Sequence, residues 1–169
     1  MMFNILVPGG SSGHAVRGGI IAIVIGPWAA IIAISVTLVL QALIFGDGVI
    51  TAIATNCVNM GVVVSFVAYY AYKFISGNSA ITSSMRVIAA AIAGWISLTI
   101  AAFCAGFELG IQPILEHTAD GVPLYMPYHL NVTIPTRVLE HALAFGILET
   151  VIITIIFAYI QRTDPSVFY

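Results

Sequence analysis

The chain has 169 residues, of which 60% are hydrophobic and 7% are charged, and its net charge is −2. Soluble domains carry about 25% charged residues, so this composition excludes a water-soluble globular protein and indicates an integral membrane protein. The near-neutral charge also excludes the basic surface that a nucleic-acid partner requires. Because the apolar stretches do not alternate residue by residue as barrel strands do, we expect an all-α fold.

Five helical segments are predicted from the apolar runs and the breaks between them. In chain order they cover residues 13–25, 27–45, 49–74, 81–111 and 134–161. Gly-Pro at 26–27, Gly-Asp-Gly at 46–48 and Ser-Gly-Asn-Ser at 76–79 mark three of the breaks. Most segments reach the roughly 17–25 residues that cross a bilayer, so we expect a polytopic bundle of about five membrane helices. The bundle is expected to form a single membrane-embedded domain over residues 1–169.

The placement of basic residues predicts the orientation in the membrane. Lys73 and Arg86 bracket one loop and Arg162 begins the C-terminal tail, whereas the loop at 112–130 has acidic residues and no basic one. Because short cytoplasmic loops are enriched in Lys and Arg, we expect the basic loop and the C-terminus to face the cytoplasm. The protein is then a multi-pass protein of the cell membrane. Counting helices places the loop that carries His14 outside.

His14 is the first candidate for chemistry, because it stands between a glycine-serine stretch, GGSSG at 9–13, and a long apolar run. Glycines allow positive φ angles and a close approach of the main chain to a ligand. Imidazole suits nickel, zinc, copper and similar metals, and the hydroxyl of Ser12 could support such a ligand. The alternative is a histidine that only forms hydrogen bonds at a helix end.

A polar face in the third segment is the second candidate. Asn56, Asn59 and Met60 lie at i, i+3 and i+4, so a helix places them on one side. At 1.5 Å per residue this face lies about 12 Å below the external turn, where it could line the floor of a pocket beneath His14. The alternative is hydrogen bonding between helices.

Ionisable residues within the last segment are costly in a membrane, so they are expected to be paired or functional. Arg137 and Glu140 are three residues apart and can pair with each other, and Arg17 could meet Glu140 near the external surface. His141 and Glu149 could form a proton relay or a structural pair. The outer loop adds side chains that could attract divalent cations loosely: Glu116, His117, Asp120 and His129.

Three stretches of the chain, residues 2–19, 26–60 and 140–165, resemble the CbiM/NikM family. Members are the substrate-capture components of energy-coupling factor (ECF) transporters for cobalt or nickel. The resemblance implies about seven membrane helices with an external metal pocket, and it implies that His14, in the Gly-His-Ala-Val stretch, is a metal ligand.

The beginning of the chain differs from the family, whose other ligands come from a Met-His-Ile-Pro opening. This chain begins Met-Met-Phe-Asn, so we expect it to be short at the N-terminus relative to the family. The missing ligands would then lie on a second polypeptide, or the start is wrongly assigned. Arg17 also stands where glycine is expected, and its charge would oppose a nearby cation unless Glu140 neutralises it.

The resemblance implies uptake of Co²⁺ or Ni²⁺ by an ATP-driven transporter and a supply of metal to cobalamin synthesis. No phosphate-binding loop, HExxH motif or nucleophile triad is present in the sequence, so we expect no enzyme activity. The expected partners are a membrane coupling subunit, ATPase subunits and a small accessory membrane subunit. The metal is cargo, and no permanent cofactor is expected.

Two other functions are weighed against metal uptake. Capture of an organic vitamin would require aromatic side chains in an external pocket, whereas Tyr69, Tyr70 and Tyr72 cluster at the cytoplasmic end. An intramembrane metalloenzyme would require His14, His141 and Glu149 at one depth, whereas His14 is expected at the outer rim and Glu149 near the middle of its helix.

Overall fold

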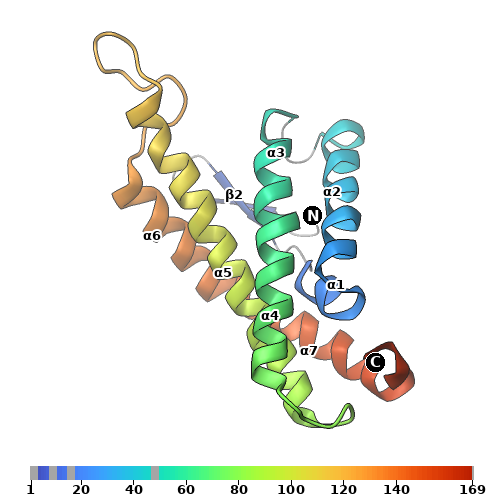
Figure 1. Cartoon of the computed structure of the whole chain (residues 1–169). Helices are drawn as coiled ribbons and strands as arrows, with labels where there is room; N and C mark the ends of the chain where they lie inside the picture. The colour runs from blue at the N-terminus through green and yellow to red at the C-terminus, as the bar shows by residue number, and fades with distance from the viewer. Residues whose placement is uncertain (1–3, 8–10, 15–17, 47–49, 169) are drawn as a thin grey trace.

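A computed structural model describes the backbone of residues 4–7 and 11–14 and the complete residues 18–46 and 50–168. Two strands, β1 (Asn4–Val7) and β2 (Ser11–His14), form an antiparallel hairpin in which Asn4 lies opposite His14. The other regular elements of the described chain are all helices, and loops connect them (Figure 1). The short α1 and the long α2 come first: Gly18–Ile25 and Pro27–Ile44.

The third helix is continuous but changes type along its length. It passes through a 3₁₀ turn, an α segment, a π segment and a longer α segment: η1 (Ile50–Ala52), α3 (Ile53–Asn56), η2 (Cys57–Val63) and α4 (Val64–Ser76). α5 (Ser84–Leu115) follows. The last helix also contains a π segment, and a 3₁₀ turn ends the chain: α6 (Leu130–Glu140), η3 (His141–Phe145), α7 (Gly146–Thr163) and η4 (Pro165–Phe168).

The predicted all-α membrane fold is confirmed. In the part of the chain that the structure describes, four helices are long and apolar enough to cross a membrane: Pro27–Ile44, Ile50–Ser76, Ser84–Leu115 and Leu130–Thr163. The fifth predicted segment is α1, whose 8 residues extend only about 12 Å and cannot cross a bilayer. Large apolar side chains cover the outside, such as Trp28 (73% exposed) and Ile32 (67% exposed), as expected of a surface that faces lipid.

The first predicted helix begins later than expected. We expected it from residue 13, but Ser11–His14 pairs with Asn4–Val7 as a strand, so the helix begins at Gly18. The reason is local: Pro8-Gly9-Gly10 between the two short strands is a strong turn signal. His14 is therefore the last residue of a hairpin strand and not part of a helix.

The polar outer loop is shorter than predicted, because both flanking helices include a proline. α5 continues past Pro113 to Leu115, since the Glu116 backbone N–H still donates to the Gln112 carbonyl at 2.8 Å. The last helix begins at Leu130 and not at residue 134, and Pro135 lies inside it. The loop is thereby reduced to residues 116–129.

α5 is the central helix of the bundle and runs diagonally across it (Figure 1). It packs against α4 on one side and against α6 and α7 on the other. Small side chains on α5 allow this, since Ala89, Ala90 and Ala93 are fully buried against Ile153 and Phe157 of α7. Without a hydrophobic driving force between helices in lipid, such close backbone approach is the main source of helix association.

The contact between α5 and α6 is the closest of these approaches. A Cβ added to Gly106 would lie 2.9 Å from Ile134 Cα and 3.0 Å from the Thr133 carbonyl oxygen. The Thr133 hydroxyl donates a hydrogen bond of 2.7 Å to the Gly106 carbonyl. Gly110 is packed as tightly, with Leu130 Cα 2.7 Å from the position of an added Cβ. Two glycines therefore set the distance between the helices.

Substituting Gly106 tests this contact. We expect Gly106→Ala to lower the free energy of unfolding by about 1–3 kcal/mol, because the new methyl group meets backbone atoms that cannot move aside. The measurement is the thermal unfolding midpoint in detergent, followed by circular dichroism. Gly19→Ala is the matched control, since its added Cβ would meet neighbours at an ordinary 3.5 Å. Equal midpoints for both variants would contradict the prediction.

Candidate functional site

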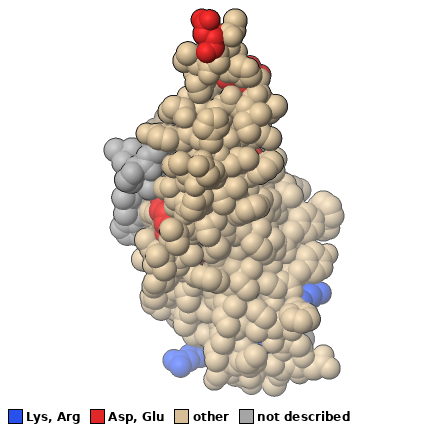
Figure 2. Space-filling view, turned by 90° about the vertical axis from the view of Figure 1, so that its left-hand side faces the viewer, with Lys and Arg blue, Asp and Glu red and all other residues tan. Residues whose placement is uncertain are grey.

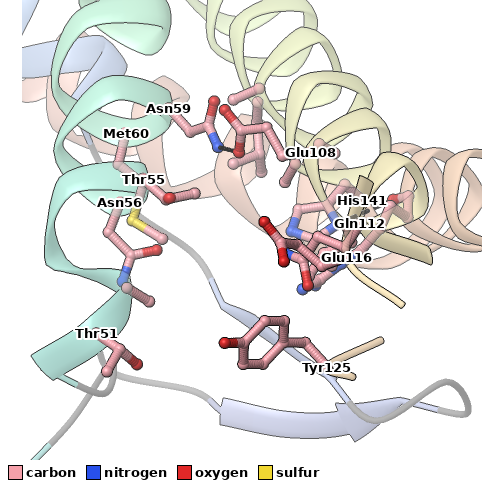
Figure 3. Close-up of a pocket in the computed structure, with 17 residues that line it drawn as sticks. Thr51, Thr55, Asn56, Asn59, Met60, Glu108, Gln112, Glu116, Tyr125 and His141 are labelled. Atoms are coloured by element: carbon pink, nitrogen blue, oxygen red, sulfur yellow. Dashed lines mark hydrogen bonds between the residues drawn. The ribbon is translucent and has the colours of Figure 1, made fainter. Parts of the chain in front are cut away.

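A cavity of about 570 Å³ lies at the end of the bundle that carries the loop 116–129 (Figure 3). It is bounded by helix Ile50–Ser76, by the C-terminal half of α5, and by α6 with the start of η3. Its polar and ionisable lining residues are Thr51, Thr55, Asn56, Asn59, Glu108, Gln112, Glu116, Tyr125, Arg137 and His141. Apolar residues complete the walls, and they include Met60, Leu98 and Ala101.

The face predicted from Asn56, Asn59 and Met60 forms one wall of this cavity (Figure 3). Asn59 is 5% exposed. It lies with Met60 in the π segment η2, and His141 on the facing side begins the other π segment, η3. π segments change the angular position of the side chains that follow them and occur frequently at functional sites. Both π segments of the described chain thus contribute lining residues.

Glu108 faces Asn59 from α5 and was not singled out in the sequence. The Asn59 side-chain amide, Nδ2, donates a hydrogen bond of 2.6 Å to Glu108 Oε2 (Figure 3). A signal for it was present, because Ala101, Ala105, Glu108 and Gln112 follow one another at helical spacing along a single face. An acidic residue within a predicted membrane helix is by itself a candidate functional group.

This contact fixes the orientation of the Asn59 side-chain amide. Because a carboxylate accepts hydrogen bonds, the nitrogen of the amide must face Glu108, which leaves the Asn59 Oδ1 atom on the other side. Asn59 Oδ1 is buried and has no hydrogen-bond partner among the described residues. A buried carbonyl oxygen without a donor is rare in proteins and indicates a place for water or a cation.

The third wall carries the charged group that the sequence predicted. Arg137 Nη1 and Glu140 Oε2 lie 3.8 Å apart, so the predicted ion pair is present. His141 Nδ1 lies 3.0 Å from the Arg137 carbonyl oxygen. Since a carbonyl only accepts, Nδ1 carries the proton in this contact, and Nε2 holds the lone pair of the neutral ring. This arrangement is typical of histidines that are oriented to bind a metal.

Most of the remaining ionisable residues that the sequence predicted do not line the cavity. Glu149 is 2% exposed, lies beside Gly94, and does not line the described cavity, so it does not join His141 there. Of the four outer-loop residues singled out in the sequence, only Glu116 lines the cavity; His117, Asp120 and His129 are exposed in or beside the loop. Among the complete residues, no three His, Cys, Asp or Glu side chains gather closely enough to hold a metal ion.

For His14 and Ser12 the structure describes the backbone, which belongs to strand β2. This strand contacts η3, which begins at His141 and adjoins the cavity. The hairpin therefore lies against the element that supplies one of the cavity walls. The predicted partner of Glu140, Arg17, lies outside the described residues.

Comparisons with known proteins identify the family. Residues 1–167 match CbiM, described as the cobalt uptake substrate-specific transmembrane region. The chain is 46% identical over its whole length to the "Probable fused nickel transport protein LarMN" of Lactiplantibacillus plantarum, covering 50% of that protein. It is 45% identical over 98% of its length to the "Fused nickel transport protein NikMN" of Rhodobacter capsulatus, covering 48%. The chain thus spans about half the length of these curated relatives.

A solved structure gives the same result. The crystal structure of a truncated transition metal transporter superposes with a TM-score of 0.90 at 41% identity, covering 96% of this chain and 74% of that one. Sequence, fold and relatives agree, and the chain belongs to the CbiM family.

Proposed function

We propose that this chain is the metal-capturing membrane region of a transporter that takes up Co²⁺ or Ni²⁺. The observation that carries the proposal is the cavity between the spans, with the hydrogen-bonded pair of the buried Asn59 and the half-buried Glu108 in its wall. Family membership supports a divalent transition-metal cargo, since relatives are named as nickel and cobalt transport proteins. The metal is the substrate, not a resident cofactor.

In the proposed orientation this cavity lies at the external side of the membrane. Figure 2 shows acidic atoms at the end that carries the loop 116–129 and basic atoms toward the opposite end, with a largely uncharged surface between them. The basic end includes Lys73, Arg86 and Arg162, which the positive-inside rule assigns to the cytoplasm. An ion would then meet the acidic, open end of the cavity first.

We propose that His14 is a ligand in this cavity and that Ser12 supports it. The contact of β2 with η3 supports this proposal, because η3 begins at the cavity-lining His141. The imidazole supplies a nitrogen ligand suited to either metal, and the lone pair of His141 Nε2 is a second candidate. Asn56 and Met60 complete the wall nearest to Asn59.

Two carboxylates can attract a cation into the cavity before any nitrogen ligand coordinates it. Glu108 and Glu116 both line it, and a charge in a membrane-enclosed cavity is screened less than one at a water-exposed surface. The free Asn59 Oδ1 atom lies beside Glu108 and adds a neutral oxygen. Together these groups can hold a hydrated divalent cation while nitrogen ligands replace its water molecules.

Capture of an organic vitamin is the second candidate function, and the lining disfavours it. Among the described lining residues, Tyr125 is the only tyrosine, phenylalanine or tryptophan. Pockets for organic cofactors are usually lined by several apolar and aromatic side chains. The small apolar side chains of this lining offer no aromatic surface on which an organic ring could stack, whereas its amides, carboxylates and histidine can bind a small hydrated ion.

The proposed uptake requires further subunits. We propose a membrane coupling subunit, ATPase subunits of the energy-coupling factor type and a small accessory membrane subunit, because the sequence contains no phosphate-binding loop that could bind ATP. Cobalt delivered by such a transporter would supply cobalamin synthesis.

Replacing His14 tests the proposed ligand. We expect His14→Ala to reduce uptake of radioactive Ni²⁺ or Co²⁺ to background in cells that also produce the partner subunits. The bundle should persist, because the described core is formed by side chains of α1, α4, α5 and α7, all of which remain unchanged. The matched control is His129→Ala, which removes an exposed imidazole that does not line the cavity. Normal uptake by the His14 variant would refute its role as a ligand.

Replacing Glu108 separates its charge from its hydrogen bond. In Glu108→Gln the new amide oxygen still accepts from Asn59, so we expect normal stability but about tenfold weaker Ni²⁺ binding by calorimetry in detergent. In Glu108→Ala the Nδ2 atom of Asn59 loses its acceptor, so the buried Asn59 side chain has no partner at either end and unfolding should become about 1–3 kcal/mol easier.

Asp120→Asn is the control for the Glu108 variants, because it removes the same charge from an exposed loop position outside the cavity. We expect it to bind Ni²⁺ as the unmodified chain does. Equal affinities for Glu108→Gln and the unmodified chain would show that the carboxylate does not attract the cation.

A further inference from the structure

A second cavity, of about 700 Å³, lies at the opposite, basic end of the bundle. It is formed where the end of α1, the end of α4, the start of α5 and the C-terminal turn η4 meet. One part of its lining is polar and cationic: Tyr69, Tyr72, Lys73, Ser76, Asn78 and Arg86. The other part is apolar: Ile23, Val24, Ile25, Val167 and Phe168. None of the described lining residues is acidic.

The two cations in this cavity keep donors available for a ligand. Arg86 uses Nε on the Ser79 carbonyl at 3.0 Å and Nη1 on the Tyr72 hydroxyl at 3.2 Å. The other three of the five N–H donors of Arg86 remain available to a ligand. The Tyr72 hydroxyl accepts from Arg86 and can donate its own proton. Lys73 is exposed, with Nζ 4.7 Å from the centre of the Tyr69 ring. Neither cation has an acidic partner among the described residues.

The walls of this cavity are fixed by contacts between distant parts of the chain. The buried Gln161 side chain of α7 donates to the carbonyls of Ile81 and Ser83, which ties the loop between α4 and α5 to the last helix. The Phe168 ring of η4 stacks on Phe157 with centroids 4.4 Å apart. The donors of Arg86 and Tyr72 are therefore held in place before a ligand arrives.

We propose that this cavity binds a phosphate ester, and that its source is the headgroup of an anionic phospholipid. Cationic side chains of a bundle at the cytoplasmic membrane surface are typical of headgroup recognition. Tyrosine and lysine side chains beside the cavity are also typical of the level of the headgroups. The apolar half of the lining favours a lipid over a soluble phosphate, because it offers contact to the glycerol and the first acyl carbons.

The test measures binding of phosphatidylglycerol to the chain in detergent by native mass spectrometry, with phosphatidylcholine as the neutral reference. We expect a preference for phosphatidylglycerol and a loss of about fivefold in its affinity in Lys73→Gln. Lys73→Arg should retain binding. Arg162→Gln is the matched control, because it removes one exposed positive charge from the same end but outside the cavity.

Arg86→Lys is the second variant, because it keeps a charge but loses the fixed donor geometry. We expect it to weaken phosphatidylglycerol binding while gel filtration and circular dichroism stay unchanged. Competition by inorganic phosphate or glycerophosphoglycerol at the same concentration would support the phosphate site but assign it to a soluble anion.

Three results would each overturn the proposal. The first is equal binding of phosphatidylglycerol and phosphatidylcholine, and the second is an equal loss of binding in Lys73→Gln and Arg162→Gln. The third is unchanged lipid binding in Lys73→Gln; weaker association of that variant with the coupling subunit would then make the cavity a docking site for an acidic protein segment.

Discussion

The close contact of α5 with α6 is the constraint on which the candidate site depends. Gly106 and Gly110 turn one side of α5 toward α6, where their missing side chains let the two backbones meet. The opposite side of the same two turns then faces helix Ile50–Ser76, and Glu108 lies on it. A bulkier residue at either glycine would move α5 away from α6 and alter the distance from Glu108 to Asn59. The packing of small residues thus positions the polar pair.

The two π segments explain why polar residues gather at one depth. Asn59 lies in η2 and His141 begins η3, so each span departs from regular α geometry at the level of the cavity. A π turn widens the helix and leaves backbone groups less well paired, which is a cost in a membrane. Because a π segment is present in both spans at the level of the cavity, we infer that the altered geometry positions these side chains.

The sequence predicts the bundle well because few side chains are charged, so the long apolar runs must lie in the membrane; of the predicted segments, α1 is too short to cross it. It also predicts the face of Asn56, Asn59 and Met60, since helical spacing alone places them together. It does not reveal the contact between Glu108 and Asn59, because these two residues are 49 positions apart in sequence. The hairpin start was missed for another reason: a four-residue strand has too few positions for its period to be distinguished from a helical one.

A layer of buried side chains on α5 and on helix Ile50–Ser76 lies between the two cavities. From one end of α5 to the other come Arg86 of the basic cavity, then the fully buried Ala89 and Ala93, and then Leu98 of the polar cavity. Helix Ile50–Ser76 has the same order in reverse, with the fully buried Ala68 between Met60 and Tyr72. This layer also contains the side chains of Ser65, Ser97 and Glu149, but each of them is at most 2% exposed, so no open route joins the two cavities through the described residues. The packing therefore suits a protein that holds an ion at one end of the membrane, and it disfavours an open channel.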